Sequence, residues 1–322
     1  MSDQRPLVSA IVPLYNHASY VAQNIRSLIE QSYENMELIV IDDGSTDASF
    51  EVVSRMKGEC DRRFERVVLV SQDNAGVAAT LNRGIEIARG PYLFLLSSDD
   101  YVEKTSVDTL LPLVANDDAV CFACGDADFV DDKGRPIIRT RGRQAFTSFV
   151  RFHFHGLTGI SLPDDFGTYK SFLIGNYIPP GVLLRRSSVR EVGGYDTKCA
   201  IEDVDLWLKL SKRWRFAFAN QTLTHYRWHG KNTALTSRER LRYDELVIFV
   251  REAEYCAQNG YYAIWAKAFL ERLARFRSAR EKLIDGRHNS TSRKMAKSLE
   301  RAAKVYWARI RAAAQTSTAR KP

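Results

Sequence analysis

Short apolar runs alternate with amphipathic stretches along the first 130 residues, and this alternation limits the folds open to the chain. The apolar runs, rich in β-branched residues, are 7–13, 36–41, 67–70, 91–96 and 119–130. Between several of them, apolar residues recur at helical spacing. Helices that connect successive strands are typical of βαβ units. The sequence therefore predicts an α/β protein with a mostly parallel central sheet.

The pattern changes twice further along the chain. Residues 142–180 lose clear periodicity and are rich in aromatic residues, which indicates a long functional loop or an inserted segment. Regular patterns return with a short strand over 181–184, a helix over about 203–210 and an extended segment over 214–228. From residue 238 onward the pattern is purely helical. We therefore expect one domain over residues 1–237 and a helical C-terminal extension over 238–322.

Composition excludes several other classes of protein. With 45% hydrophobic and 27% charged residues among 322, the chain has the composition of a globular protein with ample core. No apolar run approaches the roughly 18–20 residues of a membrane span, and the first residues lack the pattern of a secretion signal. The five cysteines are scattered, and Cys121 and Cys124 have no second pair to complete a zinc site. We expect buried cysteines in a cytoplasmic protein.

The positive charge of the chain is concentrated at its C-terminal end. Residues 238–322 contain 20 Lys and Arg against 9 Asp and Glu, whereas the remaining residues contain 27 against 30. Apolar spacing predicts three helices with cationic faces, the last of which carries Leu299, Tyr306 and Ile310. These helices are expected to pack on the first domain, to form a homo-oligomer, or to dock peripherally on anionic lipids at the inner face of a membrane. No recognised nucleic-acid motif accompanies the charge, so we expect no nucleic-acid partner.

Pairs of acidic residues stand where two of the expected strands end. Asp42 and Asp43 follow the second strand, and Asp99 and Asp100 follow the fourth. Ligands of open parallel sheets bind at the carboxyl ends of strands, where these carboxylates would meet and repel one another. A divalent cation such as Mg²⁺ or Mn²⁺ would neutralise them and bridge to substrate phosphates. Each pair taken alone is also consistent with a helix cap or a turn.

Other nucleotide- and phosphate-binding classes lack their motifs here. The first strand runs into PLYN at residues 13–16 rather than into GxGxxG, no P-loop occurs, and IDDGSTD lacks the alternating aspartates of an Asp-nucleophile phosphohydrolase. A third acidic cluster, EDVD at residues 202–205, precedes an apolar helical stretch. This cluster is consistent with a favourable helix start or with a general base that deprotonates a hydroxyl group.

Five segments in order strongly resemble family 2 glycosyltransferases. They are VSAIVPLYN, MELIVIDDGSTD, DNAGVAATLNRGIEIARGPYLFLLSSDD, PPGVLLRRSSVREVGGYD and IEDVDLWLKL, and the resemblance covers about residues 7–230. It implies the GT-A fold, in which one α/β domain binds a nucleotide-sugar and transfers the sugar with inversion of the anomeric centre. Composition and periodicity do not show glycosyl transfer; the motif match implies it.

The resemblance also implies a nucleotide site. Pro13, Tyr15 and Asp43 are expected to line the nucleotide pocket, with Asp43 near the base. Asn82 and Arg83, in LNRGIE, match a stretch that lies close to the nucleotide in the family.

A metal site, a base and an acceptor site follow from the same resemblance. SSD at residues 97–99 occupies the position of the metal-binding DxD motif, with Ser97 in place of its first aspartate. Ser97 and Ser98 are expected to lie at the donor sugar-nucleotide, and the expected ligands of Mn²⁺ or Mg²⁺ are Asp99, Asp100 and His229. Asp203 matches the catalytic base, and Gly181 and Glu202 are expected beside the acceptor.

The implied reaction is metal-assisted transfer from a nucleotide-diphosphate sugar to a saccharide or lipid-linked acceptor, in the synthesis of a surface polysaccharide or glycolipid. Asp203 would remove the acceptor proton while the cation holds the diphosphate. Rings expected to stack on the acceptor lie within 142–180 and are Phe149, Phe152, His153, Phe154, His155 and Tyr169. The alternative is a catalytically silent sugar-nucleotide-binding or scaffold protein, which Ser97 and the basic C-terminal helices suggest.

Overall fold

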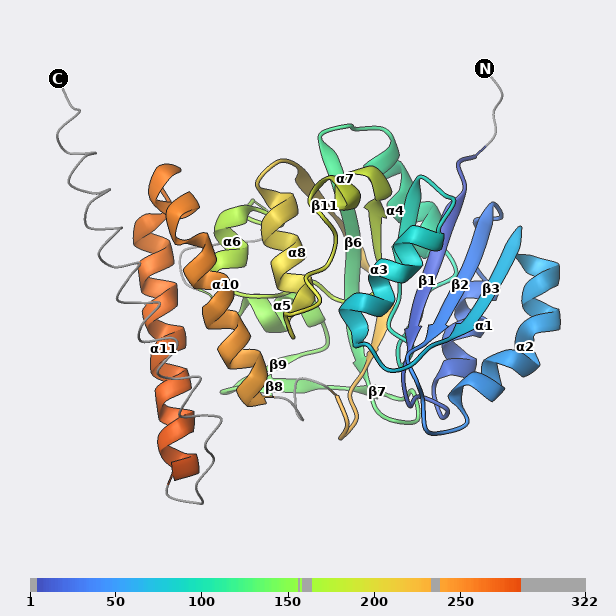
Figure 1. The fold of residues 1–322 in the computed structure, drawn as a ribbon, viewed down its shortest axis with the longest axis horizontal. Helices are drawn as coiled ribbons and strands as arrows, with labels where there is room; N and C mark the ends of the chain where they lie inside the picture. The colour runs from blue at the N-terminus through green and yellow to red at the C-terminus, as the bar shows by residue number, and fades with distance from the viewer. Residues whose placement is uncertain (1–4, 156, 158–163, 233–237, 285–322) are drawn as a thin grey trace. The chain divides into compact units, whose positions relative to one another are not determined.

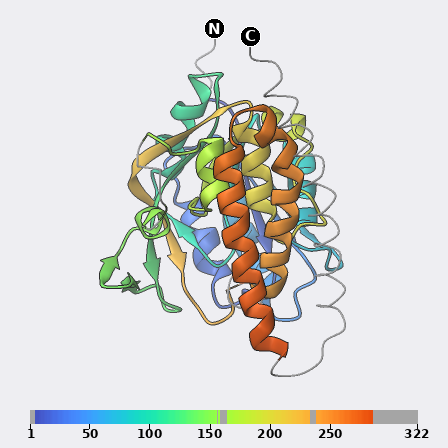
Figure 2. The ribbon, with the colours of Figure 1, turned by 90° about the vertical axis from the view of Figure 1, so that its left-hand side faces the viewer.

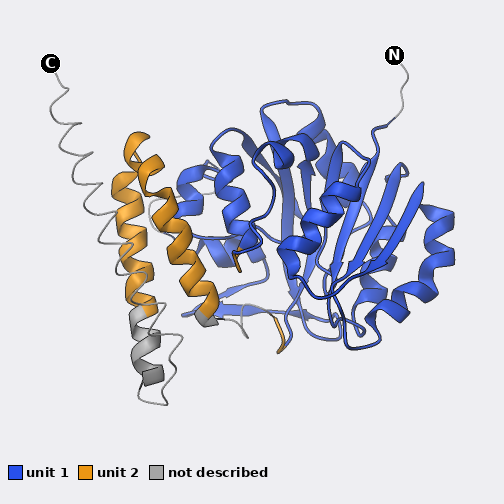
Figure 3. Ribbon diagram, viewed as in Figure 1, with its two compact units in different colours: residues 1–198, 202–229 blue, residues 199–201, 230–322 orange. Residues whose placement is uncertain are grey.

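The computed structural model describes residues 5–155, 157, 164–232 and 238–284. They fall into two compact units (Figure 3). The first unit contains the residues up to 198 together with 202–229, and the second contains 199–201 and the residues from 230 onward.

The first unit is built on a nine-stranded sheet with the order β3-β2-β1-β4-β10-β6-β11-β5, and β7 pairs with β6 at its side (Figure 1). The strands of this sheet are β1 (Val8–Leu14), β2 (Met36–Asp42), β3 (Arg66–Ser71), β4 (Tyr92–Leu95), β5 (Tyr101–Val102), β6 (Val120–Val130), β7 (Pro136–Ile137), β10 (Val182–Arg185) and β11 (Arg215–Arg227). Strands β1 to β4, β6 and β11 all run in one direction, because β10 is antiparallel to both β4 and β6. Their carboxyl ends therefore share one edge of the sheet.

Helices cover both faces of the sheet. One face packs against α1 (Val21–Ile29), α2 (Ser49–Arg63) and α4 (Ser106–Ala115) through fully buried aliphatic side chains. The other face carries α3 (Val77–Ile87), whose Gly84 lies so close to Ile11 of β1 that an added Cβ would meet its Cγ2 at 2.5 Å. On this second face Phe122 of β6 also contacts Trp207 of α8 (Glu202–Ser211). The result is a sheet between two helical layers.

The sequence-predicted α/β class with a mostly parallel sheet is confirmed, and each predicted apolar run of the first 130 residues forms a strand. Among the described strands, β10 is antiparallel to both of its neighbours, β4 and β6, and the two-residue strands β5 and β7 are antiparallel to β11 and β6. The sequence of β10, VLLR, begins with a continuous apolar run like those of the parallel strands, so its pattern does not mark its direction and only the assembled sheet defines it.

Residues 142–180 contain more regular structure than their sequence indicates. They include β9 (Gln144–Phe146), which pairs with β8 (Arg139–Arg141) in a small separate sheet that stands off the main one (Figure 2), α5 (Phe149–Phe154) and α6 (Tyr169–Ile174). Phe149, Phe154 and Tyr169 are buried, so these rings pack inside the unit. One further short helix, α7 (Arg186–Glu191), follows β10.

The cysteines agree with the expectation from sequence. Cys121 and Cys124 are free and buried, as are Cys60 and Cys256, while Cys199 is half-buried. Burial raises the pKa of the Cys121 thiol to about 12, which leaves it protonated and unreactive at neutral pH.

The second unit is a helical hairpin of α10 (Arg238–Gln258) and α11 (Tyr262–Ile284), which lie side by side in both views (Figures 1 and 2). Phe249 of α10 and Trp265 of α11 are buried, and the Trp265 indole nitrogen donates to the Phe249 carbonyl at 2.7 Å. The first two predicted C-terminal helices are therefore present, whereas the third falls on residues outside those described. Within the described ranges no helix combines the length and apolar character needed to cross a membrane.

Candidate active site

The loops that leave the carboxyl ends of the parallel strands bring distant parts of the sequence together. Strand β1 leads into Tyr15 and His17, β2 ends at Asp42, β4 leads to Asp99, and β11 leads to His229. In open α/β sheets this edge is where ligands bind. The acidic and histidine side chains that the sequence singles out therefore lie at the edge where chemistry is expected.

The loop after β2 is held rigidly by Asp43. Its carboxylate accepts hydrogen bonds from the Gln72 side chain at 2.8 Å and from the backbone N–H groups of Ala75 and Gly76 at 2.8 and 2.9 Å. Asp43 is 4% exposed, and these bonds give its buried side-chain oxygens hydrogen-bond partners. In this structure Asp43 anchors the loop after β3, beside the expected nucleotide pocket. Tyr15, by contrast, is 47% exposed and its ring is open to a ligand, while Pro13 is half-buried.

Asn82 and Arg83 on α3 both make structural contacts. The Asn82 side chain donates to the Tyr195 carbonyl at 2.8 Å and accepts from the Tyr195 backbone N–H at 2.9 Å. The Arg83 guanidinium donates to Gln72 at 2.7 Å, and Gln72 in turn holds Asp43. The two residues thus connect the loops of the expected nucleotide pocket to the segment that leads into α8.

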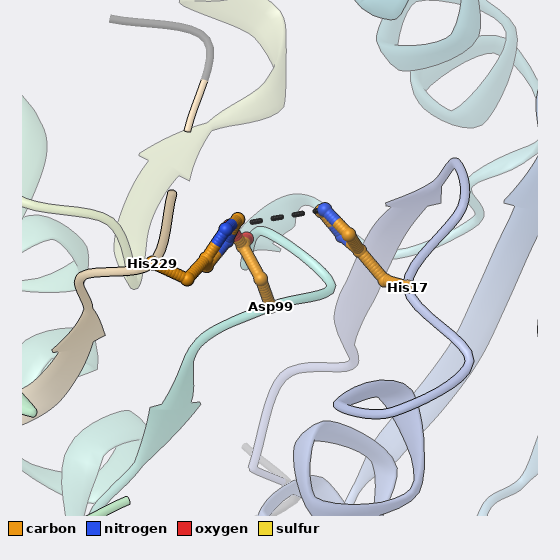
Figure 4. Close-up of side chains that lie close together, drawn as sticks. All are labelled: His17, Asp99 and His229. Atoms are coloured by element: carbon orange, nitrogen blue, oxygen red, sulfur yellow. Dashed lines mark hydrogen bonds and ion pairs between the residues drawn. The ribbon is translucent and has the colours of Figure 1, made fainter. Parts of the chain in front are cut away.

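Three side chains converge at the centre of the edge: His17, Asp99 and His229 (Figure 4). One ligand-capable atom of each lies within 4.8 Å of the others. Nε2 of His229 is 3.1 Å from Oδ2 of Asp99, and Nε2 of His17 is 3.9 Å from the same oxygen. Burial opposes ionisation of Asp99, but the hydrogen bond from His229 and the nearby His17 outweigh it, so the pKa of Asp99 lies below its ordinary value. The site therefore holds a carboxylate between two imidazoles.

This donor set fits a divalent cation. Imidazole nitrogen and carboxylate oxygen are common ligands of divalent metals, and their combination at a single point is typical of a metal site. Asp99 and His229, two of the ligands expected from sequence, belong to the cluster. The third, Asp100, is 1% exposed and accepts a hydrogen bond from the Arg227 backbone N–H at 2.7 Å. Burial and the neighbouring Asp99 charge raise the pKa of Asp100 well above its ordinary value.

The serines of the expected metal motif occupy different environments. Ser97 has an exposed side chain, and its carbonyl accepts from the Asn24 amide at 2.8 Å. Ser98 is 2% exposed and its hydroxyl lies 2.8 Å from Nδ1 of His17. Ser98 therefore contacts the cluster of His17, Asp99 and His229 through His17, a residue that no sequence motif indicates.

Two buried residues that the sequence analysis missed position this loop. Arg227 is 1% exposed, and its guanidinium donates to the carbonyls of Asp99, Asp131 and Asp132 and to the Gln23 side chain. Asn24 of α1 donates to the carbonyls of Ser97 and Asp100 at 2.8 and 2.9 Å. A fully buried arginine at the end of a strand is unusual enough to mark a structural or functional role, but its partners lie up to 204 residues away.

Asp203 and Glu202 form the first turn of α8. The helix leads directly into β11 and runs antiparallel to it (Figure 1), so its first residues lie toward the carboxyl edge of the sheet. Oδ2 of Asp203 accepts from the Asn176 amide at 2.7 Å. Burial raises the pKa of Asp203, and the hydrogen bonds from the Val204 N–H and from Asn176 only partly offset this rise. Burial and the neighbouring Asp203 charge together raise the pKa of Glu202 to about 8. A carboxyl group with a raised pKa at such an edge suits proton transfer near neutral pH.

Gly181 lies where β10 begins and has a positive φ of 77°. An added Cβ would lie 2.3 Å from the Thr224 hydroxyl oxygen, which itself donates to the Pro180 carbonyl at 3.0 Å. Only glycine fits this combination of backbone conformation and close packing. The residue therefore has a clear structural role in joining β10 to β11 across the sheet.

The fold of this chain is similar to those of proteins whose structures have been solved. Two solved structures share the fold: the Staphylococcus aureus TarS 1–349 complex with UDP and a Pyrobaculum calidifontis mannosyltransferase, PcManGT, in complex with GDP-Man and Mn²⁺. The first has a TM-score of 0.55 at 17% identity and covers 84% of this chain and 72% of its own. The second has a TM-score of 0.58 at 16% identity and covers 97% and 85%. At these identities the likeness concerns the fold, which is of the GT-A type.

Sequence comparison defines the family more closely. Residues 9–193, more than half of the chain, match the model of glycosyl transferase family 2, and the chain belongs to that family. An uncharacterized glycosyltransferase of Haemophilus influenzae is 38% identical over 132 residues, 41% of this chain and 51% of that protein. The chondroitin synthase of Pasteurella multocida is 26% identical over 251 residues, 76% of this chain and 23% of the synthase. The chain spans about half or less of the length of these curated relatives.

Proposed function

We propose that this chain is an inverting glycosyltransferase that moves a sugar from a nucleotide-diphosphate donor to a hydroxyl group of a saccharide or lipid-linked acceptor. The observation that carries the proposal is that one edge of the sheet has both a candidate cation site, made of His17, Asp99 and His229, and the Asp203 carboxyl group, whose pKa is raised. The first suits a diphosphate leaving group and the second suits deprotonation of an acceptor. Membership of family 2 and the GT-A fold support the same reaction class.

On the donor side, we assign the exposed ring of Tyr15 to the nucleotide, with Pro13 beside it. Asp43 orders the pocket wall through its three hydrogen bonds, and Asn82 and Arg83 fix that wall against the segment that leads to α8. Because these contacts already exist in the protein alone, the pocket is preorganised and the donor binds with little loss of conformational entropy.

The metal assignment is Asp99 with His229, beside the small side chains of Ser97 and Ser98. When bound, a divalent ion acts as a Lewis acid that stabilises the charge on the departing diphosphate. Asp203 accepts the proton of the attacking hydroxyl, and its hydrogen bond from Asn176 fixes the carboxylate orientation. Attack by that hydroxyl from the face opposite the leaving group is a single displacement, which inverts the anomeric centre. Gly181 and Glu202 are assigned to the surroundings of the acceptor.

Two variants test this assignment on the purified chain with UDP-, GDP- and dTDP-sugars and Mn²⁺. We expect Asp203→Asn to abolish transfer while nucleotide affinity, measured by calorimetry, stays close to that of the wild type. Asp99→Ala is expected to weaken metal-dependent nucleotide binding instead. Full activity of Asp203→Asn would remove the base assignment. Binding of a donor without transfer or donor hydrolysis across a wide acceptor panel would favour the silent-binding alternative.

For the product, we propose a surface polysaccharide or glycolipid. Relatives over most of this chain's length include the chondroitin synthase and the hyaluronan synthase of Pasteurella multocida, at 26% and 27% identity. Screening short saccharide and lipid-linked acceptors with the donor that binds best tests this proposal. Transfer only to a protein or a small non-sugar acceptor would contradict it.

We place the catalytic activity in residues 1–237 and assign residues 238–322 to peripheral contact with anionic lipids. The assignment is supported by the 20 Lys and Arg against 9 Asp and Glu in this extension. Sedimentation of the full chain with vesicles tests it. Binding to phosphatidylserine vesicles that fades with added salt is expected; equal behaviour with phosphatidylcholine vesicles, or a salt-insensitive dimer in solution, would favour assembly between copies instead.

A further inference from the structure

The loop after β1 brings a histidine to the centre of the site, although no metal motif of the sequence includes it. Nε2 of His17 points at Asp99 and lies 3.9 Å from Oδ2, on the side opposite His229 in the close-up (Figure 4). His17 is far from both partners in sequence, because Asp99 lies 82 positions and His229 lies 212 positions further along the chain. Only the sheet edge brings them together.

We propose that His17 is a ligand of the divalent cation, so that the protein offers two imidazole nitrogens and one carboxylate oxygen, and that this set selects a transition-metal ion over Mg²⁺. The inference rests on the proposed metal site and adds to it both a ligand and a class of ion. Mg²⁺ prefers oxygen ligands, whereas imidazole favours the first-row transition metals.

The two distances to Asp99 agree with a shared coordination sphere. Two ligand atoms held about 2.1 Å from one ion at right angles lie about 3.0 Å apart, and wider angles separate them by up to about 4.2 Å. The separations of 3.1 Å from His229 to Asp99 and 3.9 Å from His17 to Asp99 fall within this range. A purely structural ion pair would need only one imidazole beside the carboxylate, whereas here two imidazoles face the same oxygen.

The surroundings of His17 fix the ring as a metal ligand requires. Nδ1 lies 2.8 Å from the buried Ser98 hydroxyl. In the tautomer with the proton on Nδ1, that nitrogen donates to Ser98 and the Nε2 lone pair is directed at the site. Histidine ligands commonly use their second nitrogen in this way. The backbone is held as well, because the His17 N–H donates to the Ser49 hydroxyl at 2.8 Å and the Ala18 N–H donates to Asp47 at 3.1 Å.

Tyr20 supports both imidazoles from one side. Its ring stacks on His229 at a centroid distance of 5.1 Å and meets His17 edge-on at 5.9 Å. The Arg227 guanidinium in turn lies over the Tyr20 ring, 4.9 Å from its centroid. The two histidines therefore have little rotational freedom, which is the preorganisation expected around a metal.

The position of Ser97 gives the extra ligand a chemical reason. Ser97 occupies the position of the first aspartate of the DxD motif of family 2, so the loop after β4 has one carboxylate fewer than that motif. A neutral imidazole from the β1 loop restores the number of protein ligands without restoring the charge. The site then has one negative charge instead of two, and it depends more on nitrogen coordination and less on electrostatic attraction.

Pulsed electron paramagnetic resonance of Mn²⁺ on the purified full chain, without nucleotide, counts the coordinated imidazole nitrogens. We expect two in the wild type and one in His17→Gln, with Mn²⁺ affinity at least about tenfold weaker in the variant. In wild-type titrations, Co²⁺ and Zn²⁺ should bind more tightly than Mn²⁺, and Mn²⁺ more tightly than Mg²⁺. His17→Glu, which returns an oxygen ligand of similar reach, should retain binding and narrow the preference for Mn²⁺ over Mg²⁺.

His155→Gln is the matched control, because it removes an imidazole outside the cluster and should leave the nitrogen count at two. Thermal melts of all variants separate loss of a ligand from loss of the fold. If wild-type protein binds Mn²⁺ but His17→Gln retains its affinity and its nitrogen count, the assignment of His17 is overturned while the proposed function stands. If wild-type protein binds none of the four ions, with or without UDP, the metal-dependent function fails as well.

Discussion

Replacing Arg227 with methionine tests how strongly the active-site edge depends on one buried cation. In the wild type its guanidinium donates to the carbonyls of Asp99, Asp131 and Asp132, at 2.8, 3.1 and 3.2 Å. It also donates to the Gln23 side chain at 2.7 Å. Methionine fills most of the same volume but donates nothing, so these acceptors lose the donors of a side chain that is itself only 1% exposed.

The magnitude follows from the fate of those acceptors. Each buried acceptor left without a donor costs about 1–3 kcal/mol, but the half-exposed loop that carries Asp131 can recruit water. The carbonyls of Asp99, Asp131 and Asp132 are three such acceptors, so we expect Arg227→Met to lower the free energy of unfolding by about 3–5 kcal/mol. For a unit of this size that corresponds to a fall in Tm of about 6–20 °C.

Urea and thermal unfolding, followed by tryptophan fluorescence, measure the change. Arg227→Lys keeps the charge but loses the planar set of donors, and it should lie between the wild type and Arg227→Met. Arg143→Met, at an exposed position, is the control and should change stability by less than about 0.5 kcal/mol. A loss below about 1 kcal/mol in Arg227→Met would refute the reasoning, because the hydrogen bonds would then add almost nothing over water.

Three further outcomes concern the acceptor half of the site. Asn176→Ala removes the donor to Asp203 and so raises the pKa of that carboxyl further, which should move the acid limb of the kcat/KM profile to higher pH. Gly181→Ala combines a strained positive φ with a close contact to Thr224 and should destabilise the protein by about 2–4 kcal/mol in urea unfolding. Glu202→Gln should raise Tm above pH 8 and leave it unchanged near pH 4, because the pKa of Glu202 in the folded protein is about 8, well above its unfolded value of about 4.3.

The sign of the Glu202 effect is fixed by linkage. A carboxyl whose pKa is raised by folding favours the folded state at low pH, and that contribution is lost as the pH rises through about 8. A variant without the ionisable group lacks this loss. Equal pH dependence of Tm in Glu202→Gln and wild type would show that the group titrates normally.

The other two variants have their own controls. Gly193→Ala shares the positive φ, at 83°, but has nothing within 4 Å of the added Cβ, so it should cost only about 1–2 kcal/mol. Equal losses of stability at the two glycines would show that the destabilisation comes from backbone strain rather than from the contact with Thr224. Asn116→Ala, at an exposed position, should leave the pH profile unchanged. An unmoved acid limb in Asn176→Ala would mean that Asp203 is not the group that titrates.

The local pattern of the sequence was sufficient to predict most elements of the fold. The apolar β-branched run that forms β2 is buried at every residue, and a segment of this composition has no favourable place except a covered sheet. Asp99, in the polar turn after an apolar strand, and Asp203, in an acidic cluster before an apolar helical stretch, were visible for the same reason. These features depend on interactions between residues close together in the chain, and a sequence displays such interactions directly.

Tertiary structure alone decided which of these residues meet. His17 joins Asp99 and His229 because β1, β4 and β11 run in one direction and bring their carboxyl ends to one edge, and the pattern of a single strand does not show which strands will be its neighbours. The same contacts turn Asp100 toward the Arg227 backbone and give Asp43 its three donors. Coordination and buried hydrogen bonding act over a few ångströms in space, whereas the residues that supply them here are separated by up to two hundred positions in sequence.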